Sequence, residues 1–213
     1  MSGDCDRITV KASFWPPNIF AGESCADPNI ASGATGHIGI SIGTHVDSYV
    51  ASGDFTGVAA GLLNKLSGSM SGINAAVVNA SGEDMNGLQL AVVGNASGAD
   101  MNFWQEAVIF NIAGQDMTGF QVGWGTNIAG RDMTGAQVAG VLNYADRDMT
   151  GMQVGFANVA RDGAMKGVQI GAVNYAKGEM QAAFGIINLS ERCSLYLATP
   201  IWGGICLFGR NKD

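Results

Sequence analysis

The chain has 213 residues, of which 47% are hydrophobic and 14% charged, and glycine alone supplies 32 of them. This composition is too apolar and too weakly charged for a disordered chain, and it lacks the triplet period of collagen. The net charge of −7 and the scattered Lys and Arg residues exclude a basic nucleic-acid-binding surface and disfavour an electrostatic hold on anionic lipid. No apolar run reaches the length of about 18 residues that a transmembrane helix needs.

Residues 1–56 are predicted to form an N-terminal β cap. Strand-like runs occupy residues 7–14 and 37–43, and they are interrupted at residues 15–17, which contain two prolines, and by a loop at residues 21–33. The first seven residues are acidic and no apolar stretch follows them, so no signal peptide is predicted. The N-terminal residues therefore assign no localisation.

The same segment holds the few side chains that suit catalysis or metal binding. His37 and His45 lie near Asp47, where they could hold a metal ion or supply a base, although the pattern favours solvent-facing histidines on a cap strand or loop. Residues 33–39 are rich in glycine like a nucleotide loop, but no helix follows and the P-loop lysine is missing. No nucleophile elbow is predicted, because the one Gly-x-Ser-x-Gly match, at residues 39–43, lies inside a strand-like run. The sequence predicts no enzyme, and no catalytic, cofactor-binding or metal site.

Residues 57–190 are an internal repeat of 15 or 16 residues, which predicts one continuous body. Within each unit the pattern Met-x-Gly-x-Gln-x-Gly alternates with period two, as in a strand. Gly, Asp, Asn and Ser gather before each methionine and predict a turn there. Three residue types recur in columns: Met70, Met85, Met101, Met117, Met133, Met149, Met165 and Met180; Asn64, Asn79, Asn95, Asn111, Asn127, Asn143, Asn158, Asn174 and Asn188; and Gln89, Gln105, Gln121, Gln137, Gln153 and Gln169, with Asn74 in the first glutamine position.

Two smaller columns raise ligand-binding hypotheses. Aspartates recur in the turn and could line a calcium-binding edge, but most units offer only one or two oxygen ligands, so a solvated turn is favoured. A column of threonines suggests the hypothesis of an ice-binding face, but the column extends over only three units. The members of these columns are Asp84, Asp100, Asp116, Asp132 and Asp148, and Thr118, Thr134 and Thr150.

The repeat predicts an all-β fold: a parallel β-solenoid of 15–16-residue coils with atypical terminal caps. Like residues would then stack at the strand spacing of about 4.8 Å, with asparagine forming an amide ladder and methionine filling a soft core. The spacing from glutamine to asparagine is six residues at Gln137 but five at Gln153. A coil corner tolerates that change, whereas inside a continuous strand it would turn every later side chain to the other face.

An antiparallel up-and-down β-barrel is the alternative. Stacked aspartates would set like charges side by side in a solenoid, whereas in a barrel they would alternate between the two ends. The alternation of Phe120, Val122 and Trp124 with polar or small residues is also the apolar-out pattern of a membrane barrel. A membrane-inserting or pore-forming protein is therefore the alternative function, and a membrane partner is expected only under it.

Residues 191–213 are predicted to form a C-terminal cap and polar tail. All four cysteines lie outside the repeat, with Cys5 and Cys25 before it and Cys193 and Cys206 after it. They fit either two disulfides, Cys5–Cys25 and Cys193–Cys206, worth about 2–4 kcal/mol each, or four reduced thiols. None has the Cys-x-x-Cys spacing of a zinc or redox motif.

The unit Gly-x-Gln-Val-Gly-x-x-Asn-x-Ala, as at residues 119–129, 151–160 and 167–176, resembles the short repeats of bacterial surface repeat-containing proteins known from Leptospira. The resemblance covers residues 57–190 and implies surface exposure without an assigned enzyme activity. The prediction is a non-enzymatic repeat scaffold, a bacterial surface or host-interaction protein. Its expected partner is another protein, or a second copy bound through the apolar strand face. No nucleic acid and no cofactor are expected.

Overall fold

The computed structural model describes residues 9–14, 17–26, 35–45 and 54–192, and side chains mainly from residue 54 onward. The chain divides into two compact units, residues 1–106 and 107–213, here named the N-terminal and C-terminal units. All the regular structure in the described ranges is β strand. None of these residues belongs to a helix long and apolar enough to cross a bilayer.

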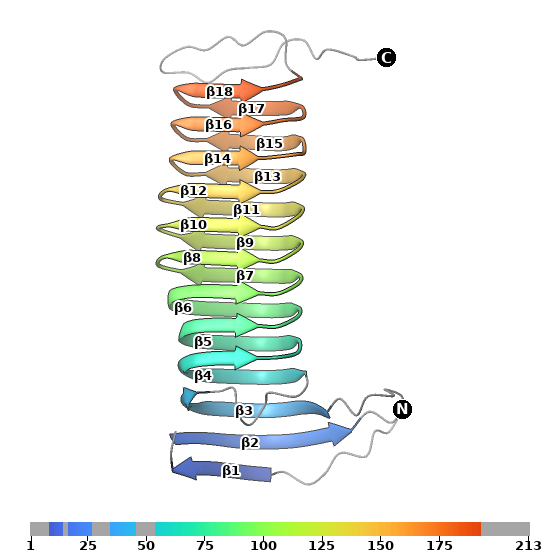
Figure 1. Ribbon diagram of the computed structural model, residues 1–213, viewed down its shortest axis with the longest axis vertical. Helices are drawn as coiled ribbons and strands as arrows, with labels where there is room; N and C mark the ends of the chain where they lie inside the picture. Colours follow the sequence, from blue (N-terminus) through green and yellow to red (C-terminus); the bar gives the residue numbers. More distant parts are fainter. Residues whose placement is uncertain (1–8, 15–16, 27–34, 46–53, 193–213) are drawn as a thin grey trace. The chain divides into compact units, whose positions relative to one another are not determined.

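The N-terminal unit begins with an antiparallel sheet and continues as a parallel one. Its first two pairings are antiparallel, and those from the third strand to the sixth are parallel (Figure 1). From β4 to β6 a single long strand bends around most of each coil, and a short turn leads to the next. The strands are β1 (Thr9–Phe14), β2 (Pro17–Ala26), β3 (Thr35–His45), β4 (Phe55–Leu66), β5 (Met70–Ser81), β6 (Met85–Ser97) and β7 (Met101–Ala107), the last ending at the boundary between the units.

The C-terminal unit uses two strands per coil. A long strand that begins with methionine leads through a two-residue corner to a four-residue strand that carries asparagine, and a turn then leads to the next coil. The long strands are β9 (Met117–Gly123), β11 (Met133–Ala139), β13 (Met149–Val154), β15 (Met165–Ile170) and β17 (Met180–Phe184). The short strands are β8 (Phe110–Ala113), β10 (Thr126–Ala129), β12 (Leu142–Ala145), β14 (Ala157–Ala160), β16 (Val173–Ala176) and β18 (Ile187–Ser190).

Like residues pair with like residues in both strand columns of the C-terminal unit. Met133 pairs in parallel with Met117 and Met149, and Asn127 with Asn111 and Asn143. The fold is therefore the predicted parallel β-solenoid, with about 16 residues per coil and about eight turns in the part of the chain that the structure describes. The antiparallel barrel is wrong, because an up-and-down barrel would reverse direction between successive repeats. The membrane prediction loses its basis with it.

The change of repeat length falls where the solenoid prediction requires it. β9 and β11 have seven residues, whereas β13 and β15 have six, and two residues still link each of them to the short strand that follows. The omitted residue is thus lost beside the corner, and neither strand changes its inward face. The asparagines stay in register across the change, since Asn143 pairs with Asn158.

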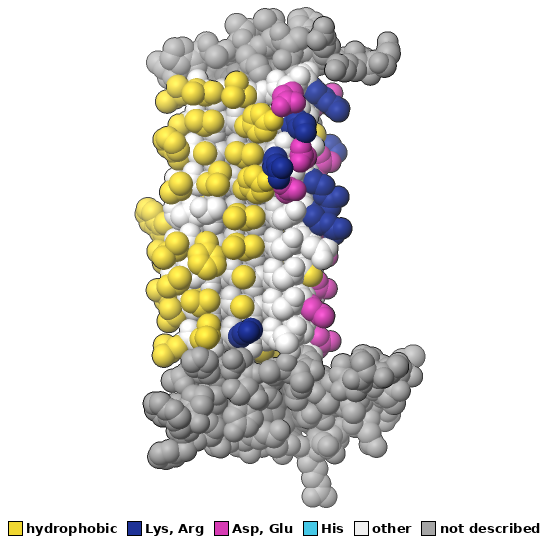
Figure 2. Space-filling view, viewed as in Figure 1, with side chains coloured by type: hydrophobic (Ala, Val, Ile, Leu, Met, Phe, Trp, Pro, Cys, Tyr) yellow, Lys and Arg dark blue, Asp and Glu magenta, His cyan; other side chains and the backbone are white. Residues whose placement is uncertain are grey.

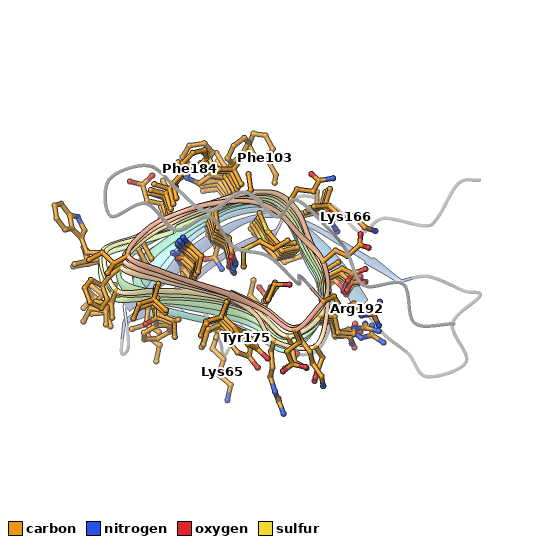
Figure 3. The ribbon with its side chains drawn as sticks, turned by 90° about the horizontal axis from the view of Figure 1, so that it is seen from above. Lys65, Phe103, Lys166, Tyr175, Phe184 and Arg192 are labelled. Atoms are coloured by element: carbon orange, nitrogen blue, oxygen red, sulfur yellow. The ribbon has the colours of Figure 1, made fainter. Side chains whose placement is uncertain are left out.

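The core of the coils is made of methionine, amides and alanine, except in β4, where Phe55 and Leu66 are also buried. Met117, Gln121, Asn127 and Ala129 are all 0% exposed, and their counterparts in neighbouring coils are buried likewise. The side chains between them point outward (Figure 3). The flexible thioether fills the space left between two close strands. The predicted methionine core and asparagine ladder are confirmed.

A glycine stands two residues after six of the eight core methionines, all but Met101 and Met180, and allows those coils to stack closely. Gly135 has a φ of 130°, and a Cβ placed there would lie 2.0 Å from the backbone oxygen of Gly119. Both the positive φ and the contact exclude a side chain. Phe103 occupies this position in the coil that begins at Met101, and it alone among the described non-glycine residues has a positive φ, of 107°.

Two predictions lie largely outside the described residues. The segment 191–213 is described only at its first two residues, so its role as a cap stays a prediction. The pairing of the four cysteines likewise rests on residues or side chains that the structure does not describe.

Candidate functional site

In the C-terminal unit the asparagine column forms a continuous chain of side-chain hydrogen bonds, from Asn111 to Asn188, directed toward the C-terminus. Nδ2 of Asn127 donates to Oδ1 of Asn143 at 3.0 Å, and Nδ2 of Asn143 donates to Oδ1 of Asn158 at 2.9 Å. The same Nδ2 of Asn127 donates to the backbone oxygen of Val138, at 2.8 Å, beside the corner of the next coil. Each asparagine therefore fixes the corner that follows it as well as the ladder.

The glutamine column forms a second ladder, directed toward the N-terminus. Nε2 of Gln137 donates to Oε1 of Gln121, and Nε2 of Gln153 to Oε1 of Gln137, both at 2.7 Å. Nε2 of Gln137 also reaches across the coil to the backbone oxygen of Tyr144, at 3.2 Å. Because the two ladders run in opposite directions, their amide dipoles oppose each other. The buried amides of the coil interior thus bond to one another and to the backbone.

The aspartates of the turn accept hydrogen bonds from the next coil. The amide N–H of Asp132 donates to Oδ1 of Asp116 at 3.0 Å, and that of Asp148 to Oδ1 of Asp132 at 3.1 Å. Nε of Arg147 lies 3.7 Å from Oδ1 of Asp132. These donors offset the like-charge contact between stacked aspartates that had favoured the barrel. The N-terminal unit repeats the bond from Ser69 to Asp54 and from Asp100 to Asp84.

The turns of the C-terminal unit also carry a cluster of ionisable side chains. Oη of Tyr144 donates to Oδ1 of Asp146 at 2.6 Å, and Nη1 of Arg161 donates to the same oxygen at 3.0 Å. Burial and the bond to Asp146 raise the pKa of Tyr144, while the bond from Tyr144 lowers the pKa of Asp146. One coil on, Nζ of Lys177 lies 2.7 Å from Oδ1 of Asp162, which raises the lysine pKa. These groups pair with one another at the surface of the coils.

The sequence-based ligand hypotheses gain little from this geometry. Within the described ranges no group of three or more His, Cys, Asp or Glu side chains is placed to hold a metal ion. Thr118, Thr134 and Thr150 do stack in register and are exposed, but Lys166 replaces threonine in the next coil. His37 and His45 lie on β3, and their side chains and Asp47 are outside what the structure describes.

The most distinctive surface of the C-terminal unit is the corner between its long and short strands. Large apolar side chains project there, on the side of the coil away from the charged turns (Figures 2 and 3). Trp124 is 79% exposed, Phe156 63% and Ile186 73%. We call this surface the apolar corner; it comprises Val108, Ile109, Trp124, Val141, Phe156, Ala172 and Ile186.

The aromatic residues expected on one strand face thus lie on the outside of the coil and not in its core. Phe120 is exposed on β9, while Trp124 projects from the corner that follows. They do not contribute to the core, because methionine and the amides already fill the interior.

The N-terminal unit has a shallow open groove of about 440 Å³. Its floor is aliphatic, and it contains one carboxylate, Glu106, whose Oε2 accepts from Nε1 of Trp104 at 3.3 Å. The groove lacks the convergent polar groups that fix a small ligand. It is lined by Ala75, Ala76, Leu90, Ala91, Val92 and Glu106.

The chain matches no family model, no curated protein and no solved structure. Its function is therefore inferred from the geometry of the coils. The columns could be located in the sequence, but the opposite directions of the two ladders and the backbone donors to the aspartates could not. The corner also could not be separated from the strand face.

Proposed function

We propose that this protein is a non-enzymatic repeat scaffold that presents its outer surface to a protein partner. The observation that carries the proposal is the contrast between the interior and the exterior of the coil. Inside, the asparagine and glutamine amides bond to one another and to the backbone. Outside, large apolar side chains such as Trp124 and Phe156 stand in solvent. Exposed apolar surface of this kind is typical of binding sites for macromolecules.

The ionisable groups agree with this proposal. In the C-terminal unit the aspartates of the turn bind backbone amides or neighbouring cations, as Asp132 does, and they stand on the convex outside of the coil. A catalytic carboxylate is usually held in a cleft with a second titratable group and a place for substrate. The described residues offer stabilised surface carboxylates instead.

We further propose that the scaffold works on a bacterial surface. The support is the resemblance of its repeat to bacterial surface repeat-containing proteins. A second support is that two sets of hydrogen bonds hold each coil to its neighbours, those of backbone pairing and those of the amide ladders. Segments held by many hydrogen bonds unfold locally only rarely, and this slows cleavage by the proteases to which surface proteins are exposed.

The surface proposal is tested by labelling cells that produce a tagged chain. Antibody should label intact cells, and protease added outside should remove the label. Label that becomes visible only after permeabilisation would contradict the surface location.

The binding proposal is tested with a photo-crosslinking amino acid placed at position 156 in the same cells. Position 118 is the control, because Thr118 is also exposed but lies on the strand face. We expect a protein adduct from position 156 and none from position 118. The absence of an adduct from position 156, or equal adducts from both, would contradict a role for the apolar corner.

A further inference from the structure

Beyond its first coil, which carries Val108 and Ile109, the apolar corner alternates large and smaller side chains along the stack. Trp124, Phe156 and Ile186 are large and lie on alternate coils, while Val141 and Ala172 lie on the coils between them. Backbone hydrogen bonds link these corners coil to coil, as from the N–H of Val141 to Gly125 and from that of Ile186 to Ala172. The corner is therefore a row of projections about 10 Å apart, separated by depressions.

Each corner from Trp124 to Ile186 contains one glycine, so a single side chain sets the height of the corner. Gly140 precedes Val141 and Gly171 precedes Ala172, so each of these corners carries one small or medium side chain and one residue with none. A Cβ at Gly140 would lie 2.3 Å from the backbone oxygen of Trp124, and the stacking therefore requires glycine there. The depressions are fixed by the backbone and do not depend on rotamers.

No charge lies in the corner segments of this unit. Residues 107–110, 122–126, 138–142, 154–157, 170–173 and 184–187 contain only apolar residues, glycine and one threonine. The charged side chains of the same unit gather at the turns, across the coil from the corner (Figure 3). A partner that covers the corner need bring no compensating charge, and the turns can stay in water.

We infer that the apolar corner of the C-terminal unit binds the same corner of a second copy of this chain, antiparallel and related by a two-fold axis. This inference names the partner of the scaffold and rests on the function proposed above. An axis midway between the coils of Val141 and Phe156 places these two residues opposite each other. It also places Trp124 opposite Ala172, and Ile186 opposite the corner of Val108 and Ile109, so each aromatic side chain faces a smaller aliphatic one. A two-fold interface must be self-complementary, and this order of side chains meets that condition.

The repeat period also favours a second copy over other partners. A row of projections with the spacing of two coils is matched along its whole length by a surface with the same spacing. The second copy supplies that spacing from its own backbone pairing, whereas a lipid surface is smooth on this scale. The absence of basic residues in the corner segments also gives no attraction to anionic headgroups.

The exposed area is of the size that a dimer needs. With about 150–250 Å² for a whole aromatic side chain, Trp124 and Phe156 together offer roughly 300 Å² at their exposures of 79% and 63%. Four aliphatic side chains that are each at least half exposed add to this area: Val108, Ile109, Val141 and Ile186. The sum approaches the roughly 800 Å² that each partner of a standard interface buries.

The first test is sedimentation equilibrium of the purified full chain over a range of concentrations. We expect a dimer, and Phe156→Glu should weaken it at least about thirtyfold, as expected for a central aromatic in an interface. The matched control Met152→Glu, at an exposed residue of β13, should leave the dimer intact. Circular dichroism checks that each variant keeps its β structure. Because the interface is uncharged and each chain carries a charge of −7, added salt should strengthen the dimer.

The second test exchanges the two residues that the axis places opposite each other. Trp124→Ala should leave a gap, and Ala172→Trp should set two tryptophans against each other, so each single change should weaken the dimer. The double variant should restore it, because a tryptophan again faces an alanine. Failure of the double variant to exceed both single variants would overturn the antiparallel pairing.

Two other outcomes would overturn the inference. One is a chain that stays monomeric at its highest soluble concentration. The other is a monomer that sediments with phosphatidylcholine vesicles and loses this binding in Phe156→Glu, which would assign the corner to lipid. Surface labelling of cells and sedimentation of the purified chain are separate measurements. A monomer found on the cell surface would therefore refute the second-copy inference and leave the surface proposal standing.

Discussion

Gln169 and Ala183 occupy the same register position on adjacent coils, and the glutamine ladder ends between them. Nε2 of Gln169 donates to Oε1 of Gln153 at 2.7 Å, as in the earlier coils. Its own Oε1 is buried and receives no hydrogen bond from the described residues, because alanine stands where the next donor would be. The last member of the ladder is thus bonded on one side, whereas Gln153 is bonded on both.

Replacing Gln153 by alanine should therefore destabilise the protein more than the same change at Gln169. Gln153→Ala removes both the donor to Gln137 and the acceptor of Gln169. Gln169→Ala removes only the donor to Gln153, together with an oxygen that already lacks a hydrogen bond. A buried polar group left without its partner costs about 1–3 kcal/mol, so we expect the two losses to differ by about that amount. Urea denaturation of both variants measures the difference. Equal losses would show that the ladder bonds contribute little.

The turn aspartates give a prediction about charge and hydrogen bonding. Asp132→Asn keeps an oxygen that can accept from the amide of Asp148 and removes one of the stacked charges, so the free energy of unfolding should stay within about 0.5 kcal/mol of the original value. Asp132→Ala removes the acceptor and should cost about 1 kcal/mol. Thermal unfolding compares the two. If Asn is as costly as Ala, the carboxylate acts through its charge and its contact with Arg147.

The solenoid could be predicted from the sequence because the residues that stabilise it recur in every coil. A parallel stack places each residue on its counterpart, so Met133 and Asn127 reappear at fixed intervals and the period is visible in one dimension. The shorter spacing after Gln153 was also informative, since only a corner absorbs it without reversing later side chains. Stacked aspartates pointed wrongly toward the barrel. The amide N–H that approaches each carboxylate belongs to the next coil and leaves no mark in the sequence.

The outer surface of the coils was harder to predict from the sequence, because the sequence period does not mark the corners. A period of two separates inward from outward side chains, but it does not say where the strand turns. Trp124 therefore reads as a further residue of the strand that carries Phe120, although it stands at the corner beyond β9. The direction of the two ladders was equally invisible, because either direction satisfies a column of identical amides. Local packing around each amide decides it.

Phe103 provides a prediction about backbone strain. Its φ of 107° lies where every other described residue with a positive φ is glycine, and its side chain is 61% exposed. Phe103→Gly should therefore stabilise the fold by about 1 kcal/mol, since relief of about 1–3 kcal/mol of strain exceeds the entropy cost of glycine. Phe120→Gly is the control, because this exposed phenylalanine has a negative φ and its loss should destabilise. The urea midpoints of the two variants should move in opposite directions. A lower midpoint for Phe103→Gly would show that the side chain stabilises the coil despite its backbone.

The Tyr144–Asp146 pair should make stability depend on pH at both extremes. The pKa of Tyr144 is raised above its ordinary 10.0, chiefly by burial, so its contribution is complete below pH 10 and is lost as pH rises through the folded value. The pKa of Asp146 is lowered below 3.8, chiefly by the bond from Tyr144, so its contribution is present above pH 3.8 and is lost as pH falls through the folded value. Tyr144→Phe removes the phenol from both effects.

Thermal midpoints measured from acid to alkaline pH should therefore vary less for Tyr144→Phe than for the original chain, in both limbs. Tyr175→Phe is the matched control, because Oη of Tyr175 donates to Glu191 at 2.9 Å and its pKa is also raised, chiefly by that bond. This control should flatten the alkaline limb and leave the acid limb unchanged, since Tyr144 still protects Asp146. An acid limb that flattens equally in both variants would mean that Asp146 does not owe its lowered pKa to the phenol. The loss of stability at acid pH would then have to come from the other carboxylates in the turns.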